Sequence, residues 1–328
     1  MLDERSAAFF ALGMAQQKQR AVAIACTSGS AVLNYAPAIA EAYYQKIPLL
    51  ILTADRPSHL VDVGDGQTIR QENVFANYIK KSYSLPLEIT SPADKKKTIL
   101  LINEAIDQTQ FPEPGPVHIN IPFDEPLYGL TDKPETGEVL DTFEKQLQVD
   151  ENTRKEFLKH WHESRKILML AGQGDSSEKL NKILLHLSGF QQVAIMTETT
   201  SNLHAPVFMD EIDNLITHIS EEETADFQPD LLITFRTSIV SKKIKKLLRK
   251  YPAKNHWHFS PSGEKRDTYF CLTGVIAMEA AEFLTREKEN LTENQSEYRN
   301  FWQRQKEQVL QKSIAFLKKT GWCDLKVF

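Results

Sequence analysis

The segment Cys26-Thr27-Ser28-Gly29-Ser30-Ala31-Val32-Leu33-Asn34 lies between two short apolar runs, residues 21–25 and residues 49–52. Each run is bounded by polar or turn residues, which is typical of strands buried on both faces of a parallel sheet. Residues 31–44, between the two runs, can form a helix. The pattern therefore predicts a strand, a turn of small residues, a helix and a second, parallel strand.

Two polar loops follow the predicted strands, the Thr27-Ser28-Gly29 turn and the Asp55-Arg56-Pro57 loop. In open α/β sheets, ligands bind outside the carboxyl ends of the strands, where both loops would lie. Gly29 would let the backbone approach a ligand closely, and amides at the start of a helix favour anions or polar ring atoms. A tight structural connection with Ser28 as helix N-cap explains the same residues, so the turn alone supports either interpretation.

Composition excludes several classes of protein. Of the 328 residues, 41% are hydrophobic and 25% are charged, which is typical of globular proteins with two domains. A net charge of −5 opposes a nucleic-acid-binding surface, and no apolar run approaches the roughly 20 residues that span a bilayer. The N-terminus has no signal-peptide pattern, and Cys26, Cys271 and Cys323 lie far apart without metal-site spacing. We therefore expect a cytoplasmic protein with no metal site of its own.

The alternation of apolar runs and helical patterns predicts an α/β fold of two consecutive domains, each with a mainly parallel sheet flanked by helices. Residues 1–129 would form the first domain, residues 130–149 a polar linker and residues 150–328 the second domain. Because the chain opens on a helix with Asp3 as its N-cap, we expect the first domain to lack its first strand and the chain to be a fragment.

Further elements follow from the same patterns. Helices are expected at residues 73–78, 92–109, 150–164, 177–188, 242–251, 275–286 and 295–319. Strands are expected at residues 115–122, 166–171, 193–197, 231–235 and 256–259.

Two features of the second domain invite a ligand-binding interpretation. Gly172-Gln173-Gly174 lacks the third glycine of a dinucleotide-binding loop, which favours a structural turn. The helix at residues 242–251 alternates charged and apolar residues, which is typical of a solvated face. Its first two residues, Lys242 and Lys243, oppose the helix dipole, and this suggests an anionic ligand nearby.

Three polar residues of the first domain are candidates for a site. Glu4 is either a first-turn carboxylate that favours the helix dipole or a carboxylate that binds a protonated ring nitrogen. Arg56 is either part of a surface salt bridge or a bidentate ligand of a substrate carboxylate. Gln67, in the next loop, could hydrogen-bond a polar group of the same substrate.

Five motifs occur in an order and at spacings that resemble those of one family. They are Asp3-Glu4-Arg5, Thr27-Ser28-Gly29-Ser30-Ala31, Leu52-Thr53-Ala54-Asp55-Arg56-Pro57, Gly64-Asp65-Gly66-Gln67-Thr68-Ile69-Arg70-Gln71 and His118-Ile119-Asn120-Ile121-Pro122-Phe123-Asp124-Glu125-Pro126-Leu127-Tyr128. Together they resemble the 2-succinyl-5-enolpyruvyl-6-hydroxy-3-cyclohexene-1-carboxylate synthases, thiamine-diphosphate transferases of menaquinone biosynthesis. The resemblance is specific over residues 2–128 and looser to about residue 320.

The resemblance implies an enzyme of three α/β domains: a pyrimidine-binding domain, a central domain and a diphosphate-binding domain. The chain resembles most of the first and the whole second, and it lacks the third, which would hold Mg²⁺ and the diphosphate. The family's reaction decarboxylates 2-oxoglutarate and adds the succinyl-semialdehyde unit to isochorismate, in a homodimer or a dimer of dimers. We therefore expect this chain alone to be inactive and to bind neither thiamine diphosphate nor Mg²⁺ tightly.

The same resemblance implies roles for individual residues. Glu4 would be the catalytic residue, hydrogen-bonded to the aminopyrimidine ring of the cofactor. The cofactor would also contact the turn residues Thr27, Ser28 and Gly29. Substrate contacts would come from Arg56, Gln67, Lys242 and Lys243. Gly66 departs from the family, in which Asn is common at this position.

Two alternatives stay open. The chain could belong to another thiamine-diphosphate synthase of the acetohydroxyacid synthase superfamily, although Gly172-Gln173-Gly174 is little evidence for the flavin-type central domain that this would need. It could also be a non-catalytic binding or interaction module that holds an aromatic or cyclic acid through its basic residues. Binding of thiamine diphosphate and Mg²⁺ would discriminate between these readings.

Overall fold

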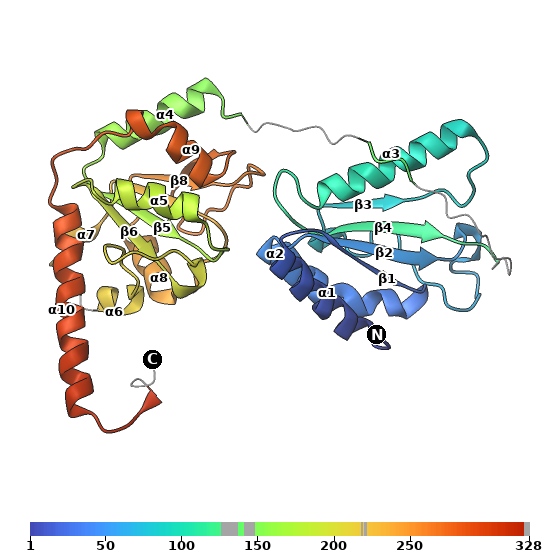
Figure 1. Cartoon of the computed structure of the whole chain (residues 1–328), viewed down its shortest axis with the longest axis horizontal. Coiled ribbons are helices and arrows are strands. Elements are labelled where there is room, and N and C mark those ends of the chain that lie inside the picture. Colours follow the sequence, from blue (N-terminus) through green and yellow to red (C-terminus); the bar gives the residue numbers. More distant parts are fainter. Residues whose placement is uncertain (126–136, 141–147, 218, 220–221, 325–328) are drawn as a thin grey trace. The chain divides into compact units, whose positions relative to one another are not determined.

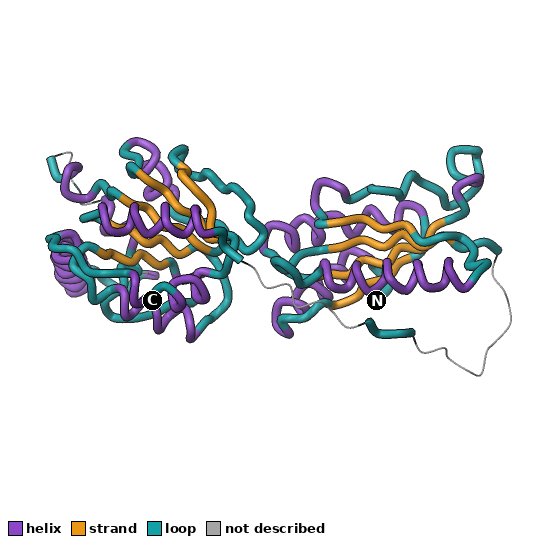
Figure 2. Tube along the Cα trace, turned by 90° about the horizontal axis from the view of Figure 1, so that it is seen from above, coloured by secondary structure: helices purple, strands orange, loops and turns teal. Residues whose placement is uncertain are grey.

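The computed structural model describes residues 1–125, 137–140, 148–217, 219 and 222–324 (Figure 1). The chain divides into two compact units, Met1–Gln146 (unit 1) and Leu147–Phe328 (unit 2). Most of the expected linker, residues 130–149, lies outside the described residues. Each unit is an α/β sandwich with helices on both faces of its sheet (Figure 2).

Unit 1 contains a four-stranded sheet in the order β1-β2-β4-β3, with every pair parallel. The strands are β1 (Val22–Cys26), β2 (Leu49–Asp55), β3 (Lys81–Ser84) and β4 (Val117–Pro122). One face carries α1 (Glu4–Lys18) and α2 (Ala36–Gln45), and the other carries α3 (Pro92–Gln108) (Figure 1). Short 3-10 turns complete the unit: η1 (Gly29–Tyr35), η2 (Ser58–Leu60) and η3 (Ala76–Tyr78).

Helix α1 illustrates how the sequence determines these layers. Asp3 is its N-cap and accepts a hydrogen bond from the backbone N–H of Ser6 at 2.6 Å, as the sequence predicts. The buried residues of the helix recur at helical spacing, so they form one stripe against the sheet: Ala8, Ala11, Leu12 and Ala15. The small size of its three alanines allows α1 to pack closely against β1 and α2.

Unit 2 contains a five-stranded, all-parallel sheet in the order β6-β5-β7-β8-β9. The strands are β5 (Ile167–Ala171), β6 (Val193–Thr197), β7 (Leu231–Phe235), β8 (Asn255–Phe259) and β9 (Leu272–Ile276). One core lies under α4 (Glu151–Glu163), α5 (Glu178–Leu187) and α9 (Ala280–Arg286). The other lies under α6 (Ile212–Thr217), α7 (Thr224–Phe227), α8 (Lys242–Lys250) and α10 (Tyr298–Lys319). The 3-10 turns are η4 (Thr199–Ser201) and η5 (Lys288–Asn290). The predicted fold class is therefore confirmed.

Several predicted boundaries are wrong for identifiable reasons. The expected helix of residues 31–44 is divided into η1 and α2, because Pro37 lacks an N–H and fits only the first turn of a new helix. Of residues 73–78, only the 3-10 turn η3 forms. The expected helix of residues 275–286 starts late, because the β-branched stretch before it is the edge strand β9.

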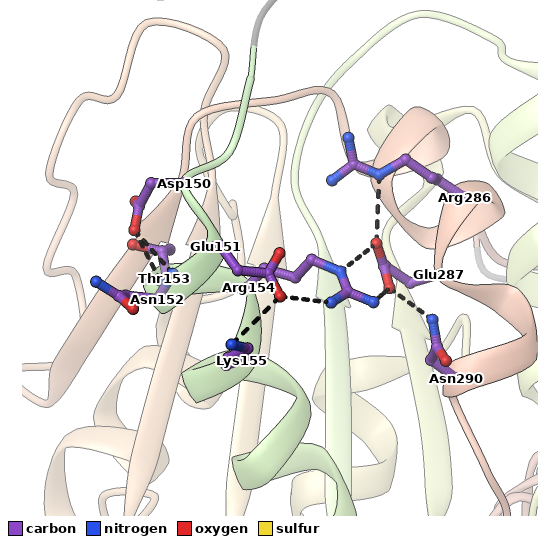
Figure 3. Close-up of polar contacts among 9 residues, drawn as sticks. All are labelled: Asp150, Glu151, Asn152, Thr153, Arg154, Lys155, Arg286, Glu287 and Asn290. Atoms are coloured by element: carbon purple, nitrogen blue, oxygen red, sulfur yellow. Dashed lines mark hydrogen bonds and ion pairs between the residues drawn. The ribbon is translucent and has the colours of Figure 1, made fainter.

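A buried ion pair fixes the first helix of unit 2 to α9 (Figure 3). The carboxylate of Glu287, which is 2% exposed, accepts hydrogen bonds from Nε and Nη2 of Arg154 at 2.9 and 2.8 Å. Asn290 and Arg286 donate to the same carboxylate at 2.9 and 3.3 Å. These hydrogen bonds, above all those from Arg154, hold the pKa of Glu287 below its ordinary value.

Glu287→Gln is expected to lower the free energy of unfolding of unit 2 by about 2 kcal/mol, because Arg154 loses its main partner. Since folding lowers the pKa of Glu287, the pair stabilises the wild type above the ordinary glutamate pKa and loses this effect as pH falls through the lowered value. Denaturant titrations at neutral and acidic pH should therefore show the difference between the two proteins shrinking in acid.

Glu151→Gln is the matched control for this prediction. Glu151 also contacts Arg154, at 3.2 Å, but its side chain is 58% exposed (Figure 3). Its loss should change stability by less than about 0.5 kcal/mol, because exposed ion pairs contribute little. Equal effects of the two substitutions would contradict the importance of the buried pair.

Candidate functional site

The carboxyl edge of the unit 1 sheet brings the two predicted loops together. Cys26, the last residue of β1, is paired in register with Thr53 of β2, and Asp55 is paired with Pro122 of β4. The Thr27-Ser28-Gly29 turn and the Asp55-Arg56-Pro57 loop therefore leave the sheet at the same edge, as the sequence predicts.

Gln67 joins a third loop to this edge. Its side-chain Nε2 donates to Thr27 Oγ1 at 2.8 Å and to Ser28 O at 3.4 Å. Its backbone carbonyl oxygen accepts a hydrogen bond from Ser28 Oγ at 3.0 Å. Ser28 occupies the N-cap position of η1, as the structural interpretation expects, but its Oγ is directed to Gln67 and makes no capping hydrogen bond. The structure thus gathers Thr27, Ser28 and Gln67 in one hydrogen-bonded group.

Gly29 is required by the same packing. Its φ of +82° lies in the left-handed region, and a Cβ at this position would come within 3.3 Å of the Gln67 backbone. Its amide donates to Gln71 Oε1 at 2.8 Å, so this N–H is not available to an anion. The close approach expected at Gly29 is therefore made by a neighbouring loop of unit 1.

Glu4 stands at the start of α1 and is half-buried. Within the described part of the chain, its carboxylate makes no hydrogen bond or ion pair. Burial raises the pKa of the Cys26 thiol to about 11, and the negative charge of Glu4 acts in the same direction. Helix α1, which carries this carboxylate, packs against β1 and against η1, which follows the turn.

Arg56 lines a hollow of about 550 Å³ at the carboxyl edge of unit 1. Its Nη2 contacts Asp65 Oδ2 and Glu125 Oε1, both at 3.3 Å. The hydrogen bonds to Asp65 and Glu125 raise the pKa of Arg56 above its ordinary value. The surface salt bridge considered from the sequence is therefore present, with two carboxylates of unit 1 at the guanidinium.

Lys242 and Lys243 lie in unit 2, at the start of α8, and line a hollow of about 1080 Å³. A carboxylate of unit 2 binds the backbone just before this helix. The carboxylate of Glu198 accepts hydrogen bonds from the backbone N–H groups of Val240 and Ser241 at 2.7 and 2.6 Å. Lys243 Nζ donates to Thr217 Oγ1 at 2.7 Å. Within unit 2, partners are thus present for the N–H groups of Val240, Ser241 and Ile244, the last through Ser241 Oγ, and an anionic ligand of Lys242 and Lys243 stays a prediction.

The Gly172-Gln173-Gly174 segment is a structural turn, as predicted. Its three backbone N–H groups donate to the carbonyl oxygens of Phe235, Ser238 and Thr200 at 3.1, 3.0 and 3.1 Å. A phosphate-binding loop needs such groups free, so this turn cannot bind a dinucleotide in the usual way.

The described residues contain no group of three or more His, Cys, Asp or Glu side chains arranged to hold a metal ion. No helix among them is long and apolar enough to cross a membrane.

Four buried polar residues beneath the two loops were not predicted as part of the site: Thr53, Gln71, His118 and Asn120. Each is at most 5% exposed, and each is hydrogen-bonded to another member of the group. The available signal was His118 and Asn120 inside an otherwise apolar predicted strand, since polar residues in such a strand need buried partners.

Comparison with known proteins identifies the relatives of this chain. Residues 1–78 match the family described as thiamine pyrophosphate enzyme, N-terminal TPP binding domain. Over 99% of its length, the chain is 40% identical to the 2-succinyl-5-enolpyruvyl-6-hydroxy-3-cyclohexene-1-carboxylate synthase of Flavobacterium johnsoniae. It is 35% identical, over 99% of its length, to the synthase of the same name from Porphyromonas gingivalis. This chain is a relative of these synthases.

The relationship confirms the family resemblance drawn from the motifs. The relative from Desulfotalea psychrophila, 38% identical over 92% of this chain, carries the same name. The chain spans 58% of the length of the Flavobacterium johnsoniae synthase and 56% of the Desulfotalea psychrophila synthase.

Proposed function

We propose that this chain supplies the pyrimidine-binding and central parts of a thiamine-diphosphate synthase that joins 2-oxoglutarate, after decarboxylation, to isochorismate. Residues 1–129 would be the pyrimidine-binding domain and residues 150–328 the central domain. The observation that carries the proposal is the unpaired, half-buried carboxylate of Glu4 beside the Thr27-Ser28-Gly29 turn, in a chain 40% identical to such a synthase.

The residues at this edge fit the pyrimidine end of the cofactor. A carboxylate that lacks a partner can accept a hydrogen bond from a protonated ring nitrogen, and such charged bonds are strong where water is excluded. Thiamine diphosphate, when bound, supplies the electron sink for decarboxylation and carbon–carbon bond formation. Glu4 would hold the proton at the ring nitrogen, and Thr27, Ser28 and Gly29 would form the wall beside the ring.

The substrates are anionic, so their binding would depend on cations and amides of this chain. Arg56 would exchange its contacts with Asp65 and Glu125 for a substrate carboxylate, since its fork of N–H groups suits bidentate binding. Gln67 would hydrogen-bond the substrate from the adjacent loop. Lys242 and Lys243 would supply further positive charge from the central domain. Mg²⁺ would be bound together with the diphosphate, as the family resemblance implies.

A homodimer or a dimer of dimers is also proposed. Helix α1 exposes the large apolar side chains of Phe9, Phe10 and Met14, at 44%, 63% and 37%, and η1 exposes Leu33 at 50%. Exposed apolar groups gathered on neighbouring elements are typical of contact surfaces between subunits. Light scattering that shows only monomer at micromolar concentration would count against this assembly.

A chimera tests the proposed function. This chain replaces the matching part of the Flavobacterium johnsoniae synthase, and product formation from 2-oxoglutarate and isochorismate is measured with thiamine diphosphate and Mg²⁺. We expect turnover by the chimera and, in calorimetry, no tight cofactor binding by the chain alone. A folded chimera that binds the cofactor without forming product would overturn the proposal, and so would turnover by the chain alone.

A further inference from the structure

A chain of buried side-chain hydrogen bonds lies under the carboxyl edge of unit 1, and the roles proposed above do not use it. Its centre is Asn120 on β4. Asn120 Oδ1 accepts from Thr53 Oγ1 at 2.8 Å and from Gln71 Nε2 at 3.0 Å, while its Nδ2 donates to Asp55 Oδ2 at 2.7 Å. All of these groups come from strand ends or from the loop that ends at Gln71.

The direction of each hydrogen bond in this chain is fixed. Thr53 has one hydroxyl proton, which it donates to Asn120, so it must accept from His118 Nε2 at 2.7 Å. His118 Nδ1 then accepts from Ser82 Oγ at 3.3 Å. Burial lowers the pKa of His118 to about 4, which keeps the ring neutral as this pattern requires. The amide of Asn120 therefore has a single favourable orientation.

This network of hydrogen bonds ends on the backbones of the two loops, the Thr27-Ser28-Gly29 turn and the Asp55-Arg56-Pro57 loop. Gln71 Oε1 accepts from the N–H of Gly29 at 2.8 Å, and Gln71 Nε2 also donates to Ala54 O at 2.9 Å. Asp55 Oδ1, whose partner oxygen is held by Asn120, accepts from the N–H of Arg56 at 2.9 Å. Two adjacent side-chain amides thus connect the turn beside Glu4 to the backbone of Arg56.

We propose that Gln71 and Asn120 are positioning residues that fix the Thr27-Ser28-Gly29 turn and Arg56 relative to each other. The functional meaning rests on the proposed function, in which the turn borders the cofactor and Arg56 binds substrate. Because each amide uses both its oxygen and its nitrogen, a change at either one releases a loop as well as its neighbour. If Gln71 and Asn120 served only to satisfy buried polar groups, their hydrogen bonds would not need to lead to the backbone N–H groups of two separate loops, those of Gly29 and Arg56.

Amide hydrogen exchange, followed by NMR in this chain itself, tests the proposal. Gln71→Met and Asn120→Leu each remove one of the two bridging amides. In both variants we expect the exchange rates of the Gly29 and Arg56 amides to increase about tenfold more than the exchange rate of the Ile51 amide. Ile51 lies in the buried strand β2 and reports unfolding of the whole unit. Gln71→Glu keeps an acceptor for Gly29, so protection of that amide should return while Arg56 stays perturbed.

A control variant separates positioning from stability. Thr98→Val removes a buried hydroxyl that has no hydrogen-bond partner among the described residues, on α3, away from both loops. In this variant, the exchange rates of the Gly29 and Arg56 amides should change by the same factor as that of the Ile51 amide. If Gln71→Met also changes all three amides equally, the proposal is overturned. Gln71 lies on a loop, so this variant carries the test even if Asn120→Leu does not fold. Failure of the chimera would leave this result unaffected.

Discussion

Glu4→Gln is expected to lower the rate of product formation by the chimera by about 10²–10⁴-fold, the range over which positioned proton-transfer groups contribute. Glutamine keeps the size of the side chain, but its amide cannot hold a proton for the ring nitrogen as a carboxylate can. The loss should fall mainly on kcat, because the rest of the cofactor and substrate contacts are unchanged.

The same substitution has a small structural effect that must be measured separately. Glu4 lies in the first turn of α1, where its charge favours the helix dipole by roughly 0.3–1 kcal/mol. Thermal unfolding of the isolated chain measures this contribution without any catalysis. Glu88→Gln, at an exposed position outside the helices and strands, is the matched loss of one carboxylate. Activity of Glu4→Gln within about twofold of that control would remove Glu4 from its catalytic role.

The sequence predicts most of the strands because burial on both faces leaves continuous apolar runs. Strands β5, β6 and β7 are buried at every residue, β2 alternates buried and partly buried residues, and the parallel pairing follows from the helices between the strands. The expected burial of residues 21–25 on both faces is wrong, because β1 is an edge strand with Ala23 and Ala25 exposed. Strand β3 was not predicted, since Lys81–Ser84 is short and mostly polar and lies at the edge of the sheet. Its presence depends on pairing with β4, which no local pattern reveals.

The candidate site divides in the same way. The Thr27-Ser28-Gly29 turn and Arg56 follow predictable strands, so their common location could be inferred from the sequence. The contact from Gln71 to Gly29 spans 42 residues, and that from Asn120 to Asp55 spans 65. Such contacts depend on tertiary packing of side chains, and local propensity carries no information about them. The start of α8 is a similar case, because Glu198, which binds the backbone just before this helix, follows another strand, β6.

Gly172→Ala is expected to produce the largest loss of stability, about 3 kcal/mol or more in unit 2. A Cβ at this position would lie 2.2 Å from the carbonyl oxygen of Thr237 and 2.9 Å from its carbonyl carbon. Backbone atoms cannot relieve such an overlap by changing rotamer, as a flexible side chain can. Both segments are also held in place, because Gly172 N donates to Phe235 O and Thr237 N donates to Gln173 O, each at 3.1 Å.

Relief of this overlap would have to separate β5 from β7 at their carboxyl ends, where Ala171 is paired with Phe235. These strands lie at the centre of the sheet, so the distortion would reach both cores of unit 2. Gly321→Ala, where a Cβ would meet nothing within 4 Å, should change stability by less than about 0.5 kcal/mol. Denaturant unfolding of both variants measures the contrast. If Gly172→Ala unfolds like Gly321→Ala, the turn has the slack to move, and the glycine would then be better explained by a ligand that needs close approach to the backbone.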